Sequence, residues 1–105
     1  MEQKYSLVMT TCPGKETAKA IARLLVEQQL AACGQIFSIE SIYTWQDKVH
    51  DEPEFMLLLK TKAALMDALT KVIKDNHPYE VPEIIQLPIM NGFPAYLDWI
   101  NSNTI

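Results

Sequence analysis

The stretch "NHPYEVPE", residues 76–83, places an imidazole, a phenol and a carboxylate close together around two prolines. The imidazole of His77 could bind a metal ion or carry a proton, and Tyr79 and Glu83 could assist it. Each proline fixes its own φ angle, so the segment would present these side chains in a stiff geometry. The same pattern is typical of a helix stop, in which His77 bonds the last carbonyl groups of a helix. From the residues alone, both interpretations stay open.

Three further residues have side chains that could take part in chemistry. Cys12 and Cys33 are too few and too far apart for a disulfide framework, so we expect free thiols and a cytoplasmic location. Burial as small apolar residues is the alternative for both cysteines. Lys60 either extends its ammonium group to solvent from an apolar strand or lines a pocket with His77 and Glu83. The sequence offers no nucleophile, base and orienting group in a recognisable set, so we expect a protein that is not an enzyme.

Length and charge limit the classes of partner. A chain of 105 residues, 49% of them apolar, predicts a single domain spanning residues 1–105. The net charge of −4 argues against nucleic acid as a partner. No apolar run is long enough to span a membrane, and residues 1–11 show no signal-peptide core, so we expect no membrane partner.

Alternation and helical spacing predict the elements that must position these side chains. We expect strands at 4–12 and 83–89, two long extended runs at 35–45 and 50–61 that pair as a hairpin, helices at 15–29 and 62–76, and a short C-terminal helix from Pro94. Thr61 is the expected N-cap of the second helix. Apolar residues recur at helical spacing in both long helices, at Ala18, Ile21, Ala22, Leu25, Val26 and at Leu65, Ala68, Leu69, Val72, Ile73.

The order β-α-β-β-α-β predicts an α+β, ferredoxin-like sandwich with two helices on one face of an antiparallel sheet. The strands carry apolar residues on both faces, as in "FMLLL", whereas a solvated face would be polar. Each hairpin arm would reach about 36 Å, against about 22 Å for the first helix, so the hairpin overshoots the body. Both features predict a homo-oligomer, with Trp45 near the hairpin tip packed between subunits.

Five segments stand in one order along the chain: "ETAKAIARLLVEQQLAAC", "IYTWQDKV", "LLLKT", "NHPYEVPEI" and "YLDWI". Together they resemble the CutA family of divalent-cation tolerance proteins, and the match extends from Ser6 to about Ile100. The resemblance implies a ferredoxin-like fold, a homotrimer, and binding of copper or other divalent metal ions. It also implies clefts between subunits, which Trp45, Lys60, Tyr79 and Glu83 would line.

The sequence departs from the family's copper-binding pattern at two positions. Thr10 stands where a cysteine is expected near the end of the first strand, and Asn76 stands where a second histidine can precede the HPY motif. Of that ligand set, His77 remains. Cys12 lies two residues beyond Thr10, hence on the same strand face, and could replace the missing thiolate. We therefore predict a weak metal site formed by His77 and Cys12, shared across the subunit interface.

Three functions follow as hypotheses, of which an enzyme with His77, Lys60 and Glu83 as acid–base groups in a cleft ranks last. The first is a cytoplasmic trimer that binds copper or other divalent ions and contributes to metal tolerance, since thiolate and imidazole favour soft and borderline metals. The alternative is a signalling or scaffold trimer that binds a small ligand or a protein partner in its inter-subunit clefts.

Overall fold

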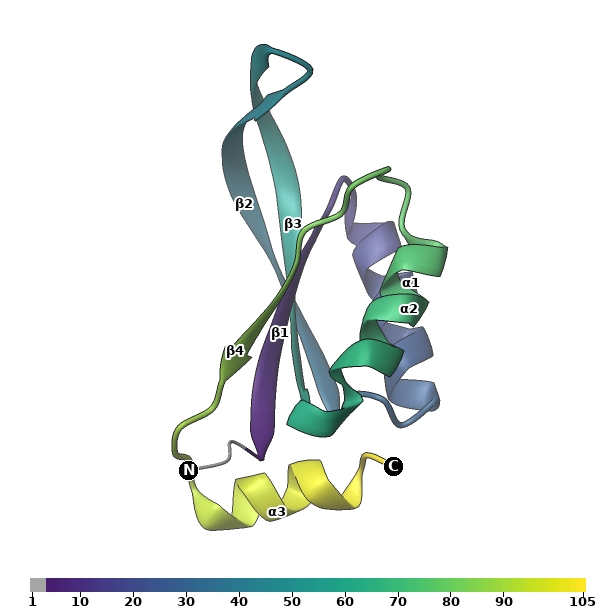
Figure 1. Ribbon diagram of the computed structural model, residues 1–105, viewed down its shortest axis with the longest axis vertical. Helices are drawn as coiled ribbons and strands as arrows, with labels where there is room; N and C mark the ends of the chain where they lie inside the picture. Colours follow the sequence, from purple (N-terminus) through teal and green to yellow (C-terminus); the bar gives the residue numbers. More distant parts are fainter. Residues whose placement is uncertain (1–3) are drawn as a thin grey trace.

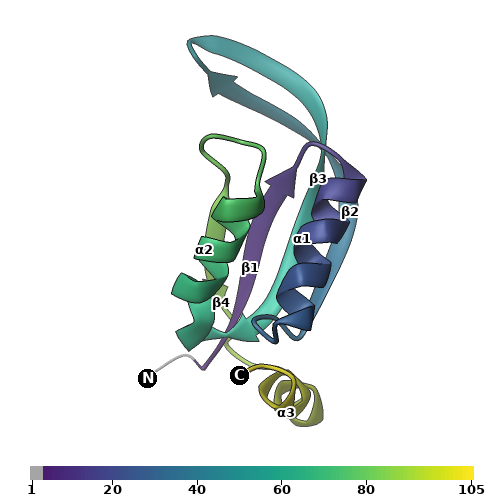
Figure 2. The same ribbon diagram turned by 90° about the vertical axis from the view of Figure 1, so that its right-hand side faces the viewer.

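The computed structural model describes residues 4–105, so the expectation about a signal peptide lies partly outside the described residues. The elements are β1 (Tyr5–Cys12), α1 (Lys15–Glu27), β2 (Cys33–Trp45), β3 (Lys48–Lys62), a 3-10 turn (Ala63–Leu65), α2 (Met66–Asn76), β4 (Ile84–Pro88) and α3 (Pro94–Ser102). The strands form one antiparallel sheet in the order β2-β3-β1-β4. Helices α1 and α2 lie side by side on one face, and α3 crosses the end of the sheet (Figures 1 and 2). The predicted α+β, ferredoxin-like arrangement is confirmed.

The main core lies between the sheet and the two long helices. Val8, Leu57 and Leu59 point from the sheet toward the apolar stripes of α1 and α2, and all three side chains are fully buried. Burial of this apolar surface is the main stabilising contribution to the fold. Two members of the predicted stripes, Val26 and Ala68, lie at the exposed margins. None of the helices in residues 4–105 is long and apolar enough to cross a membrane.

The second helix begins later than the sequence predicts. β3 continues to Lys62, and α2 begins at Met66 after the 3-10 turn. Thr61 is therefore not an N-cap, and that prediction was wrong. Its buried hydroxyl instead donates a hydrogen bond to the carbonyl oxygen of Leu30 at 2.6 Å. The bond joins β3 to the segment that follows α1, and local sequence rules do not describe such a long-range partner.

The β2–β3 hairpin extends beyond the rest of the sheet, as predicted. Pairing between β1 and β3 ends at Cys12 and Phe55, so residues 48–54 pair with β2 alone. Pro53 lies in this part of β3. Proline has no N–H group to donate, and here no second neighbouring strand requires a hydrogen bond from it. Gln46 and Asp47 form a two-residue turn with φ angles of 52° and 63°, and positive φ at both positions matches the twist of a hairpin.

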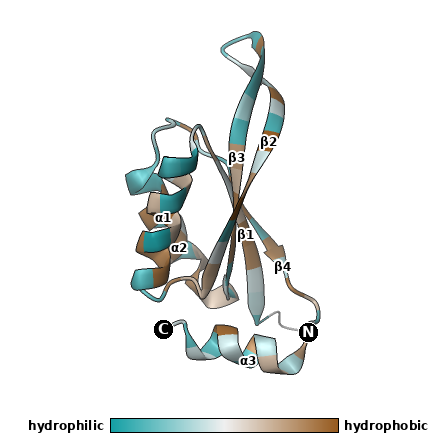
Figure 3. Cartoon of the chain, turned by 180° about the vertical axis from the view of Figure 1, so that it is seen from behind, coloured by the Kyte–Doolittle hydropathy of each residue, from teal (hydrophilic) through white to brown (hydrophobic). Residues whose placement is uncertain are grey.

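The second face of the sheet carries no helix, and its surface is apolar. Cross-strand pairing places Met9, Leu58 and Ile85 together on this open face, with Phe37 beside them. Phe37 is 49% exposed and Ile85 is 46% exposed. Figure 3 shows hydrophobic residues along the central part of the sheet. A contiguous apolar face of this kind marks an interaction surface.

Candidate functional site

A cavity of about 820 Å³ lies between the hairpin and the segment that joins α2 to β4. β2 supplies one wall with residues 39–45, and residues 78–81 with Glu83 supply the other. Thr11 at the end of β1, Gln46 of the hairpin turn, and Glu54 and Met56 of β3 complete the lining. The cavity exists because the hairpin continues past the end of β1, which leaves no central strand between the two walls.

The structure brings together three of the four residues predicted to line a cleft. Trp45, Tyr79 and Glu83 all line this cavity. Lys60 does not, because it pairs with Cys33 and Leu7 toward the other end of the sheet. Its ammonium group donates a hydrogen bond to the side-chain oxygen of Gln35. Within one chain, the expected grouping of Lys60 with His77 and Glu83 is therefore not formed.

His77 and Cys12 lie next to each other within a single chain. The Sγ atom of Cys12 is 3.9 Å from Nε2 of His77. We predicted a site shared across the subunit interface, whereas the two side chains already lie within contact distance in one chain. β4 runs antiparallel to β1 and begins at Ile84 opposite Thr10, so the short segment after α2 must pass the end of β1.

Both ring nitrogens of His77 are engaged by the backbone. Nε2 lies 2.7 Å from the carbonyl oxygen of Thr11, and Nδ1 lies 3.1 Å from the backbone nitrogen of Tyr79. The neutral tautomer with its proton on Nε2 satisfies both contacts, because it donates to Thr11 and accepts from Tyr79. His77 thus fastens the segment after α2 to the end of β1 and places Tyr79 at the cavity wall.

Cys12 has the properties of a core residue. Its side chain is fully buried against the helices. Burial, together with the negative charge of Glu54, raises the pKa of the Cys12 thiol to about 11. A metal ion that bound here would have to displace the thiol proton at a greater cost than from an exposed cysteine.

The Cys12–His77 pair does not fit a copper ion. Both imidazole nitrogens already have backbone partners, and burial raises the pKa of the thiol, so that loss of its proton to a metal ion is less favourable than for an exposed cysteine. Within residues 4–105, no group of three or more His, Cys, Asp or Glu side chains is arranged to hold a metal ion. α2 does end at Asn76 with His77 directly after it, but the imidazole bonds the carbonyl oxygen of Thr11 on β1 and not the last carbonyls of the helix, so that part of the helix-stop interpretation was wrong.

The raised pKa of Cys12 predicts a loss of stability in alkali. The folded state resists ionisation until about pH 11, whereas the unfolded chain ionises near 9.0. The stabilisation is complete below pH 9 and is lost as the pH rises from 9 toward 11, by about 2–3 kcal/mol in total. Urea unfolding across this range should show a steeper alkaline loss for the wild type than for Cys12→Ala. An unchanged slope in Cys12→Ala would contradict the assignment.

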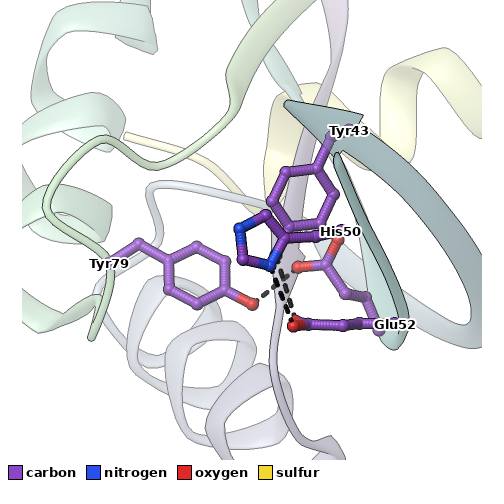
Figure 4. Close-up of polar contacts among 5 residues, drawn as sticks. Tyr43, His50, Glu52 and Tyr79 are labelled. Atoms are coloured by element: carbon purple, nitrogen blue, oxygen red, sulfur yellow. Dashed lines mark hydrogen bonds and ion pairs between the residues drawn. The ribbon is translucent and has the colours of Figure 1, made fainter. Parts of the chain in front are cut away.

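A polar cluster on the hairpin was not predicted from the sequence. The hydroxyl of Tyr43 donates to one carboxylate oxygen of Glu52 at 3.0 Å, and Nδ1 of His50 lies 3.4 Å from the other. The rings of Tyr43 and His50 stack with centroids 5.2 Å apart (Figure 4). Burial and the Glu52 carboxylate raise the pKa of Tyr43, so this phenol stays protonated as a donor.

A second phenol–carboxylate contact crosses the cavity. The Tyr79 hydroxyl donates to Glu54 Oε2 at 2.6 Å, which joins the segment after α2 to β3. Glu54 is only 5% exposed. Burial first, and then the bond to Glu54, raise the pKa of Tyr79 well above its usual range. The sequence did indicate that these side chains lie close together. His50, Glu52 and Glu54 are two residues apart in an extended run, so they lie on the same face of the strand.

Comparison with known proteins identifies the family. The family model described as CutA1 divalent ion tolerance protein matches residues 6–103. The divalent-cation tolerance protein CutA of Thermus thermophilus is 46% identical over 99 residues, which cover 93% of this chain and 96% of the relative. Protein CutA of Mus musculus is 43% identical over 100 residues, which cover 94% of this chain but only 56% of the mouse protein.

Solved structures agree with the sequence relatives. CutA1 from the psychrotrophic bacterium Shewanella sp. SIB1 superimposes with a TM-score of 0.94 at 40% identity, covering 99% of this chain and 98% of that chain. CutA1 from Oryza sativa superimposes with a TM-score of 0.94 at 42% identity, and the alignment covers 98% of this chain and 95% of that chain. The chain therefore belongs to the CutA1 divalent ion tolerance protein family.

Proposed function

We propose that this chain forms a homotrimer that binds divalent cations, copper among them, and contributes to the tolerance of the cell toward these ions. The open apolar face and the projecting hairpin support self-association, because both would be covered by second and third copies of the chain. The names of its relatives, which refer to divalent-cation tolerance, support the cation role. Relatives that are named chloroplastic and periplasmic do not share one location, and we propose the cytoplasm here because both cysteines are free.

The proposed metal role rests on the hairpin cluster, which consists of Tyr43, His50 and Glu52, and not on the Cys12–His77 pair. His50 and Glu52 supply one nitrogen donor and one carboxylate within 3.4 Å of each other, and both side chains are accessible to solvent. Nitrogen and oxygen donors of this kind suit Cu²⁺. Two protein ligands make a weak site, so the proposed role is reversible binding of an ion that is in excess.

We also propose that the role is binding rather than catalysis. The thiol of Cys12 is protonated and buried, and His77 has no free nitrogen with which to activate it. Within residues 4–105, the close pairing of Cys12 with His77 therefore lacks the properties of a catalytic couple.

Calorimetric titration of Cu²⁺ into the wild type, with the oligomeric state confirmed first, tests the metal role. We expect weak binding that His50→Ala reduces by about 10-fold or more. Cys12→Ser and His77→Ala serve as matched controls and should keep the wild-type affinity. Electron paramagnetic resonance should show nitrogen coupling to bound Cu²⁺ in the wild type and its loss in His50→Ala.

Each alternative result has a definite meaning. If Cys12→Ser weakens binding while His50→Ala does not, the thiol is the ligand and the hairpin site is wrong. If all variants bind copper equally, none of these residues belongs to a copper site.

A second candidate function is a scaffold or signalling assembly that binds a small ligand. The cavity of about 820 Å³ favours this candidate, since its volume lies within the usual range for small-molecule sites.

A further inference from the structure

The loop between β4 and α3 contains an exposed asparagine that is followed by glycine, Asn91–Gly92 (Figure 1). The backbone N–H group of Gly92 donates a hydrogen bond to Oδ1 of Asn91 at 2.8 Å. Within residues 4–105 this N–H group has no backbone acceptor, because residues 89–93 lie outside the helices and strands. The amide nitrogen of Gly92 is therefore available for reaction with the side chain beside it.

This hydrogen bond brings together the two atoms that would join in an intramolecular ring closure. Cγ of Asn91 is bonded to the oxygen that accepts the hydrogen bond, and rotation of the side-chain amide turns Cγ toward the Gly92 nitrogen. Glycine has no Cβ atom to shield that nitrogen. Groups that one chain holds close to the geometry of attack react much faster than separate molecules.

We propose that Asn91–Gly92 is a site of spontaneous deamidation. The Gly92 nitrogen loses its proton to hydroxide and attacks Cγ of Asn91, which forms a five-membered succinimide ring. The bond from Cγ to the side-chain nitrogen breaks, and this nitrogen takes up a proton from water and leaves as ammonia. Water then opens the ring at either carbonyl group, to give aspartate or isoaspartate. The sequence of steps transfers no electrons and needs water as its co-reactant.

The other asparagines of the chain are held in ways that oppose the same reaction. The Nδ2 atoms of Asn76 and Asn103 each donate to the carbonyl oxygen four residues earlier, at 2.8 Å and 2.9 Å. Asn101 lies inside α3, where the helical backbone keeps the next amide nitrogen in its own hydrogen-bond ladder. We therefore expect Asn91 to react before these three residues.

An isoaspartate at this position would strain the entry to α3, because it adds one methylene group to the main chain of a short loop. On one side, the N–H group of Ile89 is fixed to β1 by a hydrogen bond of 3.0 Å. On the other, the carbonyl oxygen of Phe93 accepts hydrogen bonds from the first turn of α3. Gly92 also packs so closely that a Cβ atom there would lie 3.1 Å from Leu97 Cδ2. The longer main chain should therefore loosen the packing of α3.

Incubation of the wild-type protein at mildly alkaline pH, with samples taken over time, tests the proposal. Tryptic cleavage after Lys74 releases residues 75–105, which contain every asparagine of the chain, and tandem mass spectrometry locates the change. We expect Asn91 to show the mass gain of amide-to-acid conversion about 10-fold or more faster than Asn101. An isoaspartate-specific carboxyl methyltransferase with labelled S-adenosylmethionine should label the aged protein.

Asn91→Gln should abolish this labelling, because glutamine would have to close a larger ring, and Asn101→Gln is the matched control that should keep the wild-type rate. Asn91→Asp carries the new charge on a normal backbone, so aged wild type should melt at a lower temperature than this variant. Equal melting temperatures would contradict the effect on α3.

The wild type unfolded in urea gives the rate of the chain without its fold. A folded protein that stays unmodified while the unfolded chain reacts would overturn the proposal, since the fold would then protect the loop. Equal labelling of the wild type and Asn91→Gln would overturn it as well, because the isoaspartate would then lie elsewhere.

Discussion

Trp45→Ala should dissociate the proposed trimer. Trp45 precedes the hairpin turn and keeps 40% of its surface exposed in the single chain, which leaves a large aromatic area for contact with a second copy. Truncation of a large aromatic residue in a packed site costs about 3–5 kcal/mol. Sedimentation equilibrium should give about three times the chain mass of 12.0 kDa for the wild type and a lower mass for the variant.

Val49→Ala is the matched control for this experiment. Val49 pairs with Thr44, so it lies near the same turn but on the opposite face of the hairpin from Trp45, and it is 75% exposed. This variant should remain trimeric. A wild type that sediments as a monomer would refute the trimer itself. A Trp45→Ala protein that stays trimeric with an unchanged melting curve would assign Trp45 to a free surface or to ligand contact alone.

Leu57→Ala should lower the free energy of unfolding by about 2–5 kcal/mol. Leu57 is fully buried at the centre of β3 and belongs to the main core with Val8 and Leu59. The close packing around it limits relaxation into the space that the substitution leaves. Chemical unfolding of the wild type and the variant measures the difference.

Gly34 offers a sharper test of the same packing. A Cβ atom at this position would lie 3.2 Å from Leu57 Cδ1 and 3.0 Å from Ala22 Cβ, so Gly34→Ala alone should destabilise the fold by about 1–3 kcal/mol. Leu57→Ala removes one of these obstacles, so the double variant should lose less than the sum of the two single losses. Strict additivity would mean that Gly34 and Leu57 do not share this space.

The fold was predictable because each element has a strong local signal. The stripe from Leu65 to Ile73 and the proline at position 94 each define a helix without reference to the rest of the chain. The start of α2 was not predictable in this way. Thr61 has the side chain of an N-cap, but its hydroxyl bonds to Leu30, and no local rule indicates that contact.

The contact between His77 and Cys12 could have been inferred from topology. Once β4 is placed antiparallel to β1, its first residue lies beside Thr10, and His77 is only a few residues away along the chain. The state of the two side chains could not be inferred, since the burial of Cys12 and the hydrogen bonds of His77 depend on the packed structure. The resemblance to a divalent-cation tolerance family favoured a ligand role for groups that here hold the segment after α2 against the end of β1.

The central position of β1 has a consequence for the order of folding. β1 pairs on one side with β3 and on the other with β4, so both of its ladders close long stretches of chain. The β2–β3 hairpin, in contrast, forms across a two-residue turn. Non-local pairing slows folding because loop entropy must be lost before any contact compensates for it. During synthesis β1 therefore gains its second partner only after residue 88 has emerged, and until then an apolar strand with an unpaired edge remains open to other chains.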